Sequence, residues 1–403
     1  MKKKLKQSVI SVVCGIASAI WITVSALGAE NASLEKTAVF ETGNQEDSSE
    51  LPDFSQLDLE SVEEYLGRNQ PEGIRISFLD LMGHLVKGEF YEAAEAIGSA
   101  VKTALVSQVS EGGRLLGQVV LLGLFGALFS GFSGMFSSGQ ISETGFFITY
   151  LLLFACLAAG FFQSIQIASG VLTRLLEFMK ALLPSFFLSV AFCGGSGAAG
   201  ALYGTTLGMV SIFQWICLNG LLPLIKIYAL LILAGKISRE DSLSKLTDLA
   251  DKAVRWGLKT MTGVLLGFQV IQGMVIPSVD AVGKGGFFRI LEAVPGVGQG
   301  ARTVTQTVLG AGVLIKNSLG AAGVIVLAAI SVLPLIQLAV LAVLYHVTAA
   351  LLEPVCDKRI VSCIHGISQA HQLLIQLVWT SLVLFSVSLA ILCAFTNVMY
   401  FAG

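Results

Sequence analysis

The chain has 403 residues, of which 54% are hydrophobic and only 13% charged, and its formal net charge is −2. A typical soluble domain carries about 25% charged residues, so this composition excludes an ordinary water-soluble protein. The near-neutral charge also excludes a general basic field that would attract nucleic acid. We therefore predict an all-α polytopic membrane protein with no nucleic-acid partner.

Residues 1–28 have the form of a signal peptide. Four lysines within the first six residues precede an apolar stretch over 9–24, and Ala26 and Gly28 supply small residues for cleavage. An uncleaved signal anchor is the alternative. Either form places the following segment on the extracytoplasmic side.

Two segments of different character separate this start from the apolar bulk. Residues 29–73 form an acidic arm, with twelve acidic side chains between positions 30 and 72 and little to bury, and we predict disorder there. In residues 74–112, apolar side chains such as Phe78 and Met82 recur at helical spacing. That spacing predicts amphipathic helices on a membrane surface or against a partner.

Residues 113–403 are predicted to form a multi-span transmembrane domain. About 7–8 apolar segments approach or exceed the length that crosses a bilayer. The block 178–235 is ambiguous, because it can hold two long spans or three short ones. The candidate spans are 115–136, 146–168, 178–197, 201–219, 221–235, 258–277, 319–345 and 373–400.

Basic residues suggest an orientation for these spans. The loop 236–259 carries six lysines and arginines, which is typical of a cytoplasmic loop. Five preceding spans would bring it there from the extracytoplasmic side. Two further spans would then place Asp357, Lys358 and Arg359 on the same cytoplasmic side.

Two pairs of prolines mark a possible internal repeat. Pro184 and Pro295 are 111 residues apart, as are Pro223 and Pro334, which predicts repeat units of about 171–277 and 282–400. Pro184 and Pro223 bracket one glycine-rich stretch and Pro295 and Pro334 bracket another, and all four prolines are candidates for a backbone break. If the duplication is real, such broken helices resemble the paired discontinuous elements of transporters. The first stretch offers these candidates for a backbone break: Gly194, Gly195, Gly197 and Gly200.

The segment "LEPVCDKRIVSCIHG", residues 352–366, gathers the densest polar chemistry of the C-terminal half. Cys356 and Cys363 are seven residues apart, about 10 Å along a helix, which is too far for both thiolates to hold one zinc ion. We therefore predict no metal and no cofactor here. The pattern favours an amphipathic cytoplasmic helix after Pro354, with Asp357, Lys358 and Arg359 on its polar side as a docking surface.

Catalytic motifs are weak. The segments 131–134 and 194–197 match the short Gly-x-Ser-Gly pattern of rhomboid-type intramembrane proteases, but the histidine and asparagine that those enzymes place upstream within the membrane are missing. The glycines of 294–302 lack a phosphate-loop lysine. We predict that the chain is not an enzyme.

Charged residues within apolar segments are the remaining candidates. Lys226 interrupts "LLPLIKIYALL", where an ionised side chain costs at least about 2.5–3.5 kcal/mol at the centre of a bilayer. We expect it to face a bundle interior, a water-filled path or a partner subunit, unless it reaches the membrane interface. Further polar candidates for an interior or pore are Arg174, Glu177, Lys180 and Gln337.

From about residue 50 onward the chain resembles the stage III sporulation protein AE family of endospore-forming bacteria. The most distinctive part is "EPVCDKRIVSCI" at 353–364, followed by a long closing span with "LLIQLVWTSLVLF". The resemblance implies a subunit of the channel between mother cell and forespore, located in the mother-cell membrane that surrounds the forespore. It also implies partners: a cytoplasmic ATPase and ring-forming proteins of the intermembrane space.

Two hypotheses follow from these observations. The first is a channel or export-apparatus subunit that works in a homo-oligomer or hetero-oligomer. The second is a free-standing secondary transporter built from an inverted repeat. The resemblance supplies no catalytic residue, and it leaves a purely scaffolding role open.

Overall fold

Every regular element of the described chain is helical, which confirms the predicted all-α class. The computed structural model describes residues 59–69, 77–86, 113, 117–125, 127–128, 139–191, 196–235, 243–292 and 298–401. The predicted signal segment, most of the acidic arm and Pro295 lie outside these residues.

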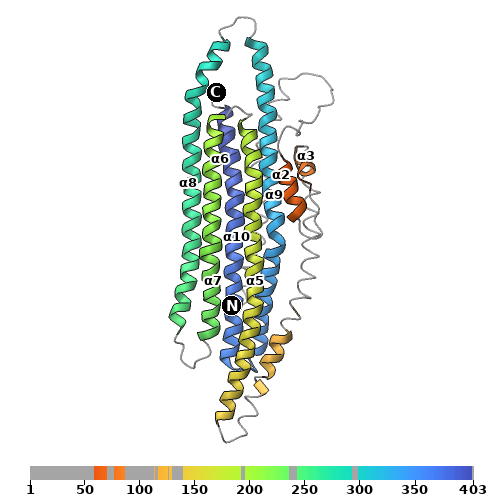
Figure 1. Cartoon of the computed structure of the whole chain (residues 1–403), viewed down its shortest axis with the longest axis vertical. Coiled ribbons are helices and arrows are strands. Elements are labelled where there is room, and N and C mark those ends of the chain that lie inside the picture. Colours follow the sequence, from red (N-terminus) through yellow and green to blue (C-terminus); the bar gives the residue numbers. More distant parts are fainter. Residues whose placement is uncertain are drawn as a thin grey trace.

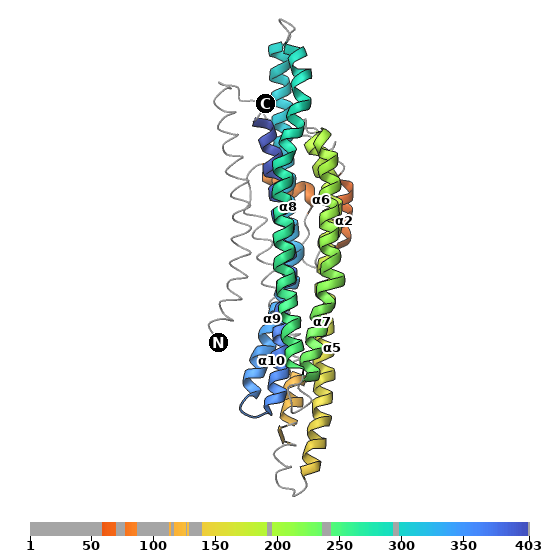
Figure 2. The same ribbon diagram turned by 90° about the vertical axis from the view of Figure 1, so that its left-hand side faces the viewer.

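Among the described residues, five long helical segments, here called legs, run up and down the molecule (Figures 1 and 2). The first rises as α5 (Gly139–Val190), and the second descends through α6 (Ser196–Ile216), a π-helical turn η3 (Cys217–Leu221) and α7 (Leu222–Gly235). The last three are α8 (Ser244–Glu292) upward, α9 (Gly298–Leu352) downward and α10 (Lys358–Phe401) upward.

The legs are longer than the predicted spans. The pair 146–168 and 178–197 falls largely within α5, and the pair 201–219 and 221–235 forms one continuous leg, so the division into eight short spans is not observed. Four helices among the residues with described side chains are long and apolar enough to cross a membrane. They are Phe147–Val190, Ala199–Gly235, Gly312–Leu352 and Lys358–Ala394.

Pro184, Pro223 and Pro334 do not interrupt the long helical legs. Pro184 and Pro334 lie inside α5 and α9, where each removes one backbone hydrogen bond without ending the helix. Pro223 follows η3, in which the Leu222 N–H bonds to the Cys217 carbonyl five residues back. This turn shifts the hydrogen-bond ladder just before the residue that lacks an N–H.

The glycine-rich break is shorter than predicted. Gly194 and Gly195 lie between α5 and α6, outside the described residues, whereas Gly197 and Gly200 belong to the first turns of α6. The residues that follow Ser196 are small or apolar, and α6 begins at Ser196 itself.

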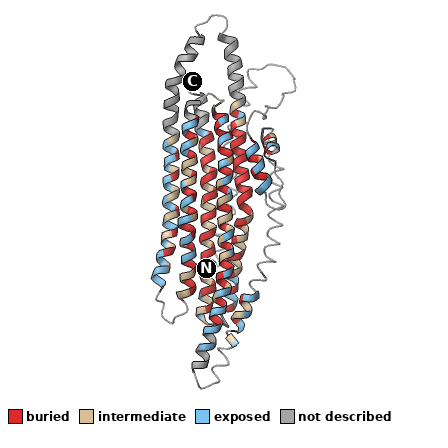
Figure 3. Cartoon of the chain, viewed as in Figure 1, coloured by how far each residue is buried: buried red, intermediate tan, exposed pale blue. Residues whose placement is uncertain are grey.

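The core lies along α9 and α10, as the buried residues in the middle of Figure 3 show. Close approach of the backbones depends on glycine at a few positions. A Cβ at Gly366 would overlap the side chain of Ile232 on α7, and one at Gly323 would overlap Leu182 on α5. Small residues of this kind let membrane helices pack tightly.

Two short helices attach to the outside of the bundle. The helix α2 (Glu60–Asn69) packs on α5, and α3 (Phe78–Val86), which matches the predicted amphipathic pattern, packs on α9. The Tyr65 hydroxyl donates to the Arg174 carbonyl at 2.7 Å. The end of the predicted disordered arm is therefore an ordered helix, because its few apolar residues share one buried face: Leu59, Val62, Tyr65 and Leu66.

Candidate functional site

Lys226 lies on the exposed side of α7 and does not face the interior of this chain. Its ammonium group sits 4.9 Å from the centre of the Phe162 ring on α5, which provides a cation–π contact. Of the environments expected from the sequence, a bundle interior formed by one copy is thus excluded. A partner subunit, a water-filled path or the membrane interface remains.

The other polar candidates of the spans also lie on outer faces. Arg174, Glu177 and Lys180 are all exposed on α5, and none makes an ion pair with a described residue. Gln337 is half-buried on α9. Pro184 and Pro223 are exposed and Pro334 is buried. The structure therefore does not gather these residues into one interior site.

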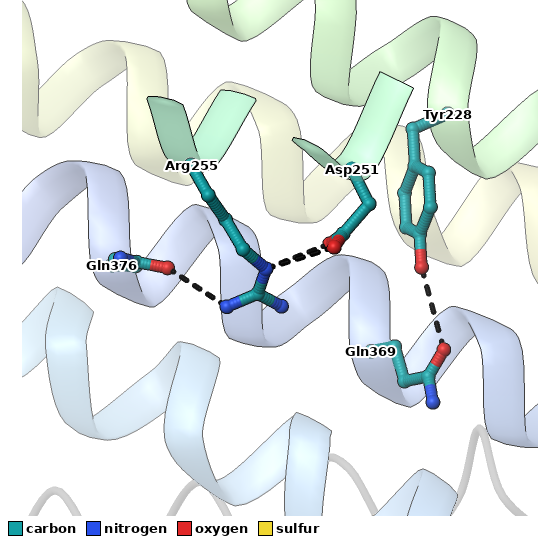
Figure 4. A network of polar contacts seen from close by, with 5 residues as sticks. All are labelled: Tyr228, Asp251, Arg255, Gln369 and Gln376. Carbon is teal, nitrogen blue, oxygen red and sulfur yellow. Dashed lines mark hydrogen bonds and ion pairs between the residues drawn. The ribbon is translucent and has the colours of Figure 1, made fainter. Parts of the chain in front are cut away.

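A polar network joins α7, α8 and α10 in the lower half of the bundle (Figure 4). On α8, Arg255 donates from Nε to both carboxylate oxygens of Asp251, at 3.0 and 2.9 Å. The same guanidinium reaches the Gln376 side-chain oxygen at 3.3 Å. Two helical turns before Gln376 on α10, the side-chain oxygen of Gln369 accepts a hydrogen bond from the Tyr228 hydroxyl at 3.3 Å. Gln376 of α10 thus provides a polar partner for the charged segment of α8, and Gln369 provides one for Tyr228 of α7.

A serine and a histidine form a fully buried pair. Ser164 on α5 donates to Nε2 of His371 on α10 at 2.8 Å, while Nδ1 of His371 donates to the Ile367 carbonyl at 2.8 Å. Phe161 and Tyr345 pack against the imidazole ring. Both polar side chains are completely buried, so no substrate reaches the hydroxyl. The pair can hold three helices in register but has no access for catalysis.

The polar segment 352–366 is a turn followed by the start of α10. Asp357 accepts from the Arg359 N–H at 2.9 Å, which is a helix N-cap contact, and also pairs with the Arg359 guanidinium at 3.4 Å. The predicted amphipathic helix is not a separate element, because α10 continues without interruption from Lys358 through the last span, and its role as a docking surface stays a prediction. The side chains of Ile360, Ile364 and Ile367 near the start of α10 are buried.

The cysteines and the histidine of this segment contact different partners and do not form a cluster. Cys356 donates to the Gly123 carbonyl at 3.2 Å, and burial raises the pKa of its thiol. Cys363 lies 2.8 Å from the Tyr150 hydroxyl. The imidazole rings of His365 and His346 lie with their centres 5.1 Å apart and their planes tilted by 51°. No group of three or more metal-ligating side chains occurs among the described residues.

Two polar residues were not anticipated as features of the interior. Lys316 is completely buried on α9, and the neighbouring Asn317 is 1% exposed with neither amide atom hydrogen-bonded. A lysine amid apolar residues was visible in the sequence. Its burial was not, since the helix is apolar on all sides and shows no inward face.

Hydrogen bonds between neighbouring helices show which residues of α5 and α8 lie at the same height along the bundle. Gln214 on α6 donates to the Leu172 carbonyl on α5, and Gln272 on α8 donates to Thr205 on α6. Thr205 lies nine residues above Gln214, about 14 Å. Leu172 is therefore level with α8 near Gly263. The contact between Gly257 and Leu221, seven residues below Gln214, agrees with this register.

This register places the uncharged parts of α5 and α8 at different levels. On α5, residues 144–173 lack charge, and on α8 residues 260–279 do. The two uncharged stretches overlap over only about five residues, or ~8 Å, against a hydrocarbon layer of about 30 Å. Where α5 exposes Arg174, Glu177 and Lys180, α8 exposes apolar side chains at the same level: Val264, Phe268 and Ile271.

A tilt of the bundle does not remove this offset. Membrane helices tilt by about 20° on average, which across a bundle ~20 Å wide shifts the levels by only about 7 Å. No single lipid layer can therefore cover the outside of one isolated copy without contacting charged side chains.

Comparison with known proteins identifies the family of this chain. Residues 76–396 match the family described as stage III sporulation protein AE. The chain belongs to the stage III sporulation protein AE family. It is 24% identical over 272 residues to stage III sporulation protein AE of Bacillus subtilis (strain 168), and the match covers 67% of this chain and 68% of that protein. No solved structure matches the chain.

The family assignment confirms the resemblance seen in the sequence and gives the chain a sporulation role. The matched region includes the five long legs and α3 and begins after α2. The structural features described above, from the Ser164–His371 pair to the offset between α5 and α8, thus belong to the region that the family shares.

Proposed function

We propose that this chain is an integral membrane subunit of the channel or export complex that links mother cell and forespore, and that forespore development requires it. It resides in the mother-cell membrane around the forespore. Its partners are other subunits of the complex, among them a cytoplasmic ATPase and ring-forming proteins between the two membranes. The single observation that carries the proposal is the offset between the charged faces of α5 and α8.

The offset favours a subunit over a free-standing protein on energetic grounds. Each ionised side chain against lipid costs about 2.5–3.5 kcal/mol near the bilayer centre, so three of them on α5 would cost about 8 kcal/mol or more. That sum is comparable to the whole stability of many proteins, about 5–15 kcal/mol. Coverage of these faces by neighbouring subunits or by water removes the cost.

The two ends of the bundle support an assignment of sides. The start of α8 and the turn between α9 and α10 lie at the same end of the bundle (Figure 1). Both carry basic residues, among them Lys245 and the exposed Lys358. We place this end in the cytoplasm by the positive-inside rule, where it is available to the ATPase.

The chain direction argues against the inverted-repeat transporter. An offset of 111 residues relates Pro223 in α7 to Pro334 in α9, and both helices run downward in Figure 1. An inverted repeat would require opposite directions. We propose instead that the duplication, with units of about 171–277 and 282–400, is related by an axis along the membrane normal.

Co-purification tests the proposal. A tagged copy of the chain, expressed from its own locus, is extracted from sporulating cells in mild detergent, with an unrelated tagged polytopic protein as the control. We expect the subunits of the sporulation complex to be recovered with this chain and not with the control. Recovery of the chain alone, as a monomer that binds a small solute, would contradict the proposal and favour the transporter.

A further inference from the structure

A line of polar and small side chains follows the outer face of α5. The positions alternate in steps of three and four residues, as does one face of a helix. All are exposed or half-buried, and Gly170 has open space where a side chain would stand. We name this set the α5 polar stripe, and its members are Gln163, Gln166, Gly170, Thr173, Glu177 and Lys180.

The opposite face of the same helix is the buried one. Phe161, Leu175 and Phe178 are at most 1% exposed and pack into the bundle. The helix is thus apolar where it meets its own chain and polar where it faces outward, which is the reverse of what lipid contact requires. Described residues of this chain leave the stripe uncovered.

The stripe begins at the level of the charged helix α2 and continues past it. The charged helix α2 binds α5 beside Arg174 and Phe178. From there the stripe extends down to Gln163, about 17 Å along the helix. Lys226, whose ammonium group lies over Phe162, flanks its lower end. Polar groups therefore form a continuous path from the α2 level into the apolar part of α5.

The charges of the stripe point to a second copy of this chain as the neighbour. Arg174, Glu177 and Lys180 alternate in sign at intervals of three residues, and none has an ion-pair partner among the described residues. In a parallel assembly, the Glu177 carboxylate of one copy can pair with a cation of the neighbouring copy, Lys180 of the stripe or Arg174 beside it. Gly170 carries no side chain and leaves open space at the centre of the stripe.

We propose that copies of this chain assemble with their α5 polar stripes facing one another around a water-containing path. The inference rests on the proposed function, since it assumes a membrane assembly, and it adds which helix faces the path. The conduit then lies between copies and not through the middle of one copy, whose interior is filled by α9 and α10.

Single cysteines test the arrangement in membranes of sporulating cells, in a functional background from which the native cysteines are removed. Gln166→Cys and Thr173→Cys probe the stripe. Val264→Cys is the matched control for Thr173→Cys, because it lies on α8 at the same level and is 64% exposed, and Ile271→Cys, about 10 Å higher on α8 and 61% exposed, is a second control. The probes are a charged methanethiosulfonate, which needs water, and a lipid-soluble maleimide.

We expect the charged reagent to modify the stripe cysteines roughly tenfold faster, or more, than the α8 cysteines, since ions partition poorly into lipid. The maleimide should modify all four. Under mild oxidation, Gly170→Cys should give disulfide-linked dimers of this chain. Stripe cysteines that react only with the maleimide, or a Gly170→Cys that cross-links solely to a different protein, would overturn the inference. If that result accompanies normal co-purification, the proposed function stands and only this inference falls.

Discussion

Ser164 and His371 show how a single polar contact acts in the apolar interior. Replacing Ser164 by Ala removes the donor to Nε2 of His371 and leaves a buried acceptor without a partner. We expect a loss of about 1–3 kcal/mol in the free energy of unfolding, the usual cost of an unsatisfied buried group. Unfolding of the purified protein in detergent measures it.

The control for this change is Ser362→Ala, because Ser362 is exposed on the same helix as His371. It should leave stability within about 0.5 kcal/mol of the unchanged protein. Equal stability of the Ser164→Ala and Ser362→Ala variants would contradict the role assigned to the buried pair.

Tyr65 makes the attachment of α2 sensitive to alkaline pH. Burial raises the pKa of Tyr65 above the usual value of about 10, and the Glu177 carboxylate raises it further, while Arg174 acts in the opposite direction. A raised pKa in the folded state means that the stabilisation is complete below about pH 10 and is lost as the pH rises through the folded-state value.

The absorbance of tyrosinate provides the measurement. The difference between the titrations of the unchanged protein and of Tyr65→Phe isolates this hydroxyl, and we expect it to ionise well above pH 10. Ionisation at the ordinary tyrosine value would show that Tyr65 is in water and that α2 is not packed on α5.

At the scale of helices, glycines with opposite surroundings give a matched pair of substitutions. Gly366→Ala introduces a methyl group into the side chain of Ile232 and should destabilise the protein by about 1–3 kcal/mol, the usual cost of overpacking. Gly204→Ala enters open space on α6 and should be neutral, or stabilise by up to about 1 kcal/mol through helix propensity. Thermal unfolding in detergent distinguishes the two.

Relief of the overlap provides a further check on α7 and α10. Ile232→Ala in the Gly366→Ala background makes room for the new methyl group, so the double variant should lose less stability than the sum of the two single changes. Additive losses would indicate that α7 and α10 do not meet at these residues.

The sequence predicts the helical class and much of the buried face of α10, but not how the helices are divided or which way they face. The sequence predicts backbone breaks at Pro184 and Pro223, yet a helix supported by neighbours tolerates a missing hydrogen bond. Lys226 could not be oriented, because α7 is apolar on nearly every side and lacks a polar face that marks the outside. The helix α2 was hidden by its charge, since only its four buried residues signal packing.

At the scale of the whole molecule, the charged faces of α5 and α8 lie at different levels along the bundle. The lower part of α8 and the upper part of α5 are charged on their outer faces, whereas residues 260–279 of α8 and 144–173 of α5 carry no charge. The sequence contains both charged segments but does not reveal that they lie at different levels, because that depends on contacts such as Gln272 with Thr205. The offset is the structural reason to regard one copy as incomplete.

Native mass spectrometry of the chain in lipid particles cut directly from sporulating membranes tests this conclusion most directly. Such particles keep the surrounding lipid and the neighbouring proteins together. The offset between α5 and α8 predicts that each particle contains more than one protein chain, with at least two copies of this one. Particles that contain a single copy of the chain surrounded only by lipid would contradict the account.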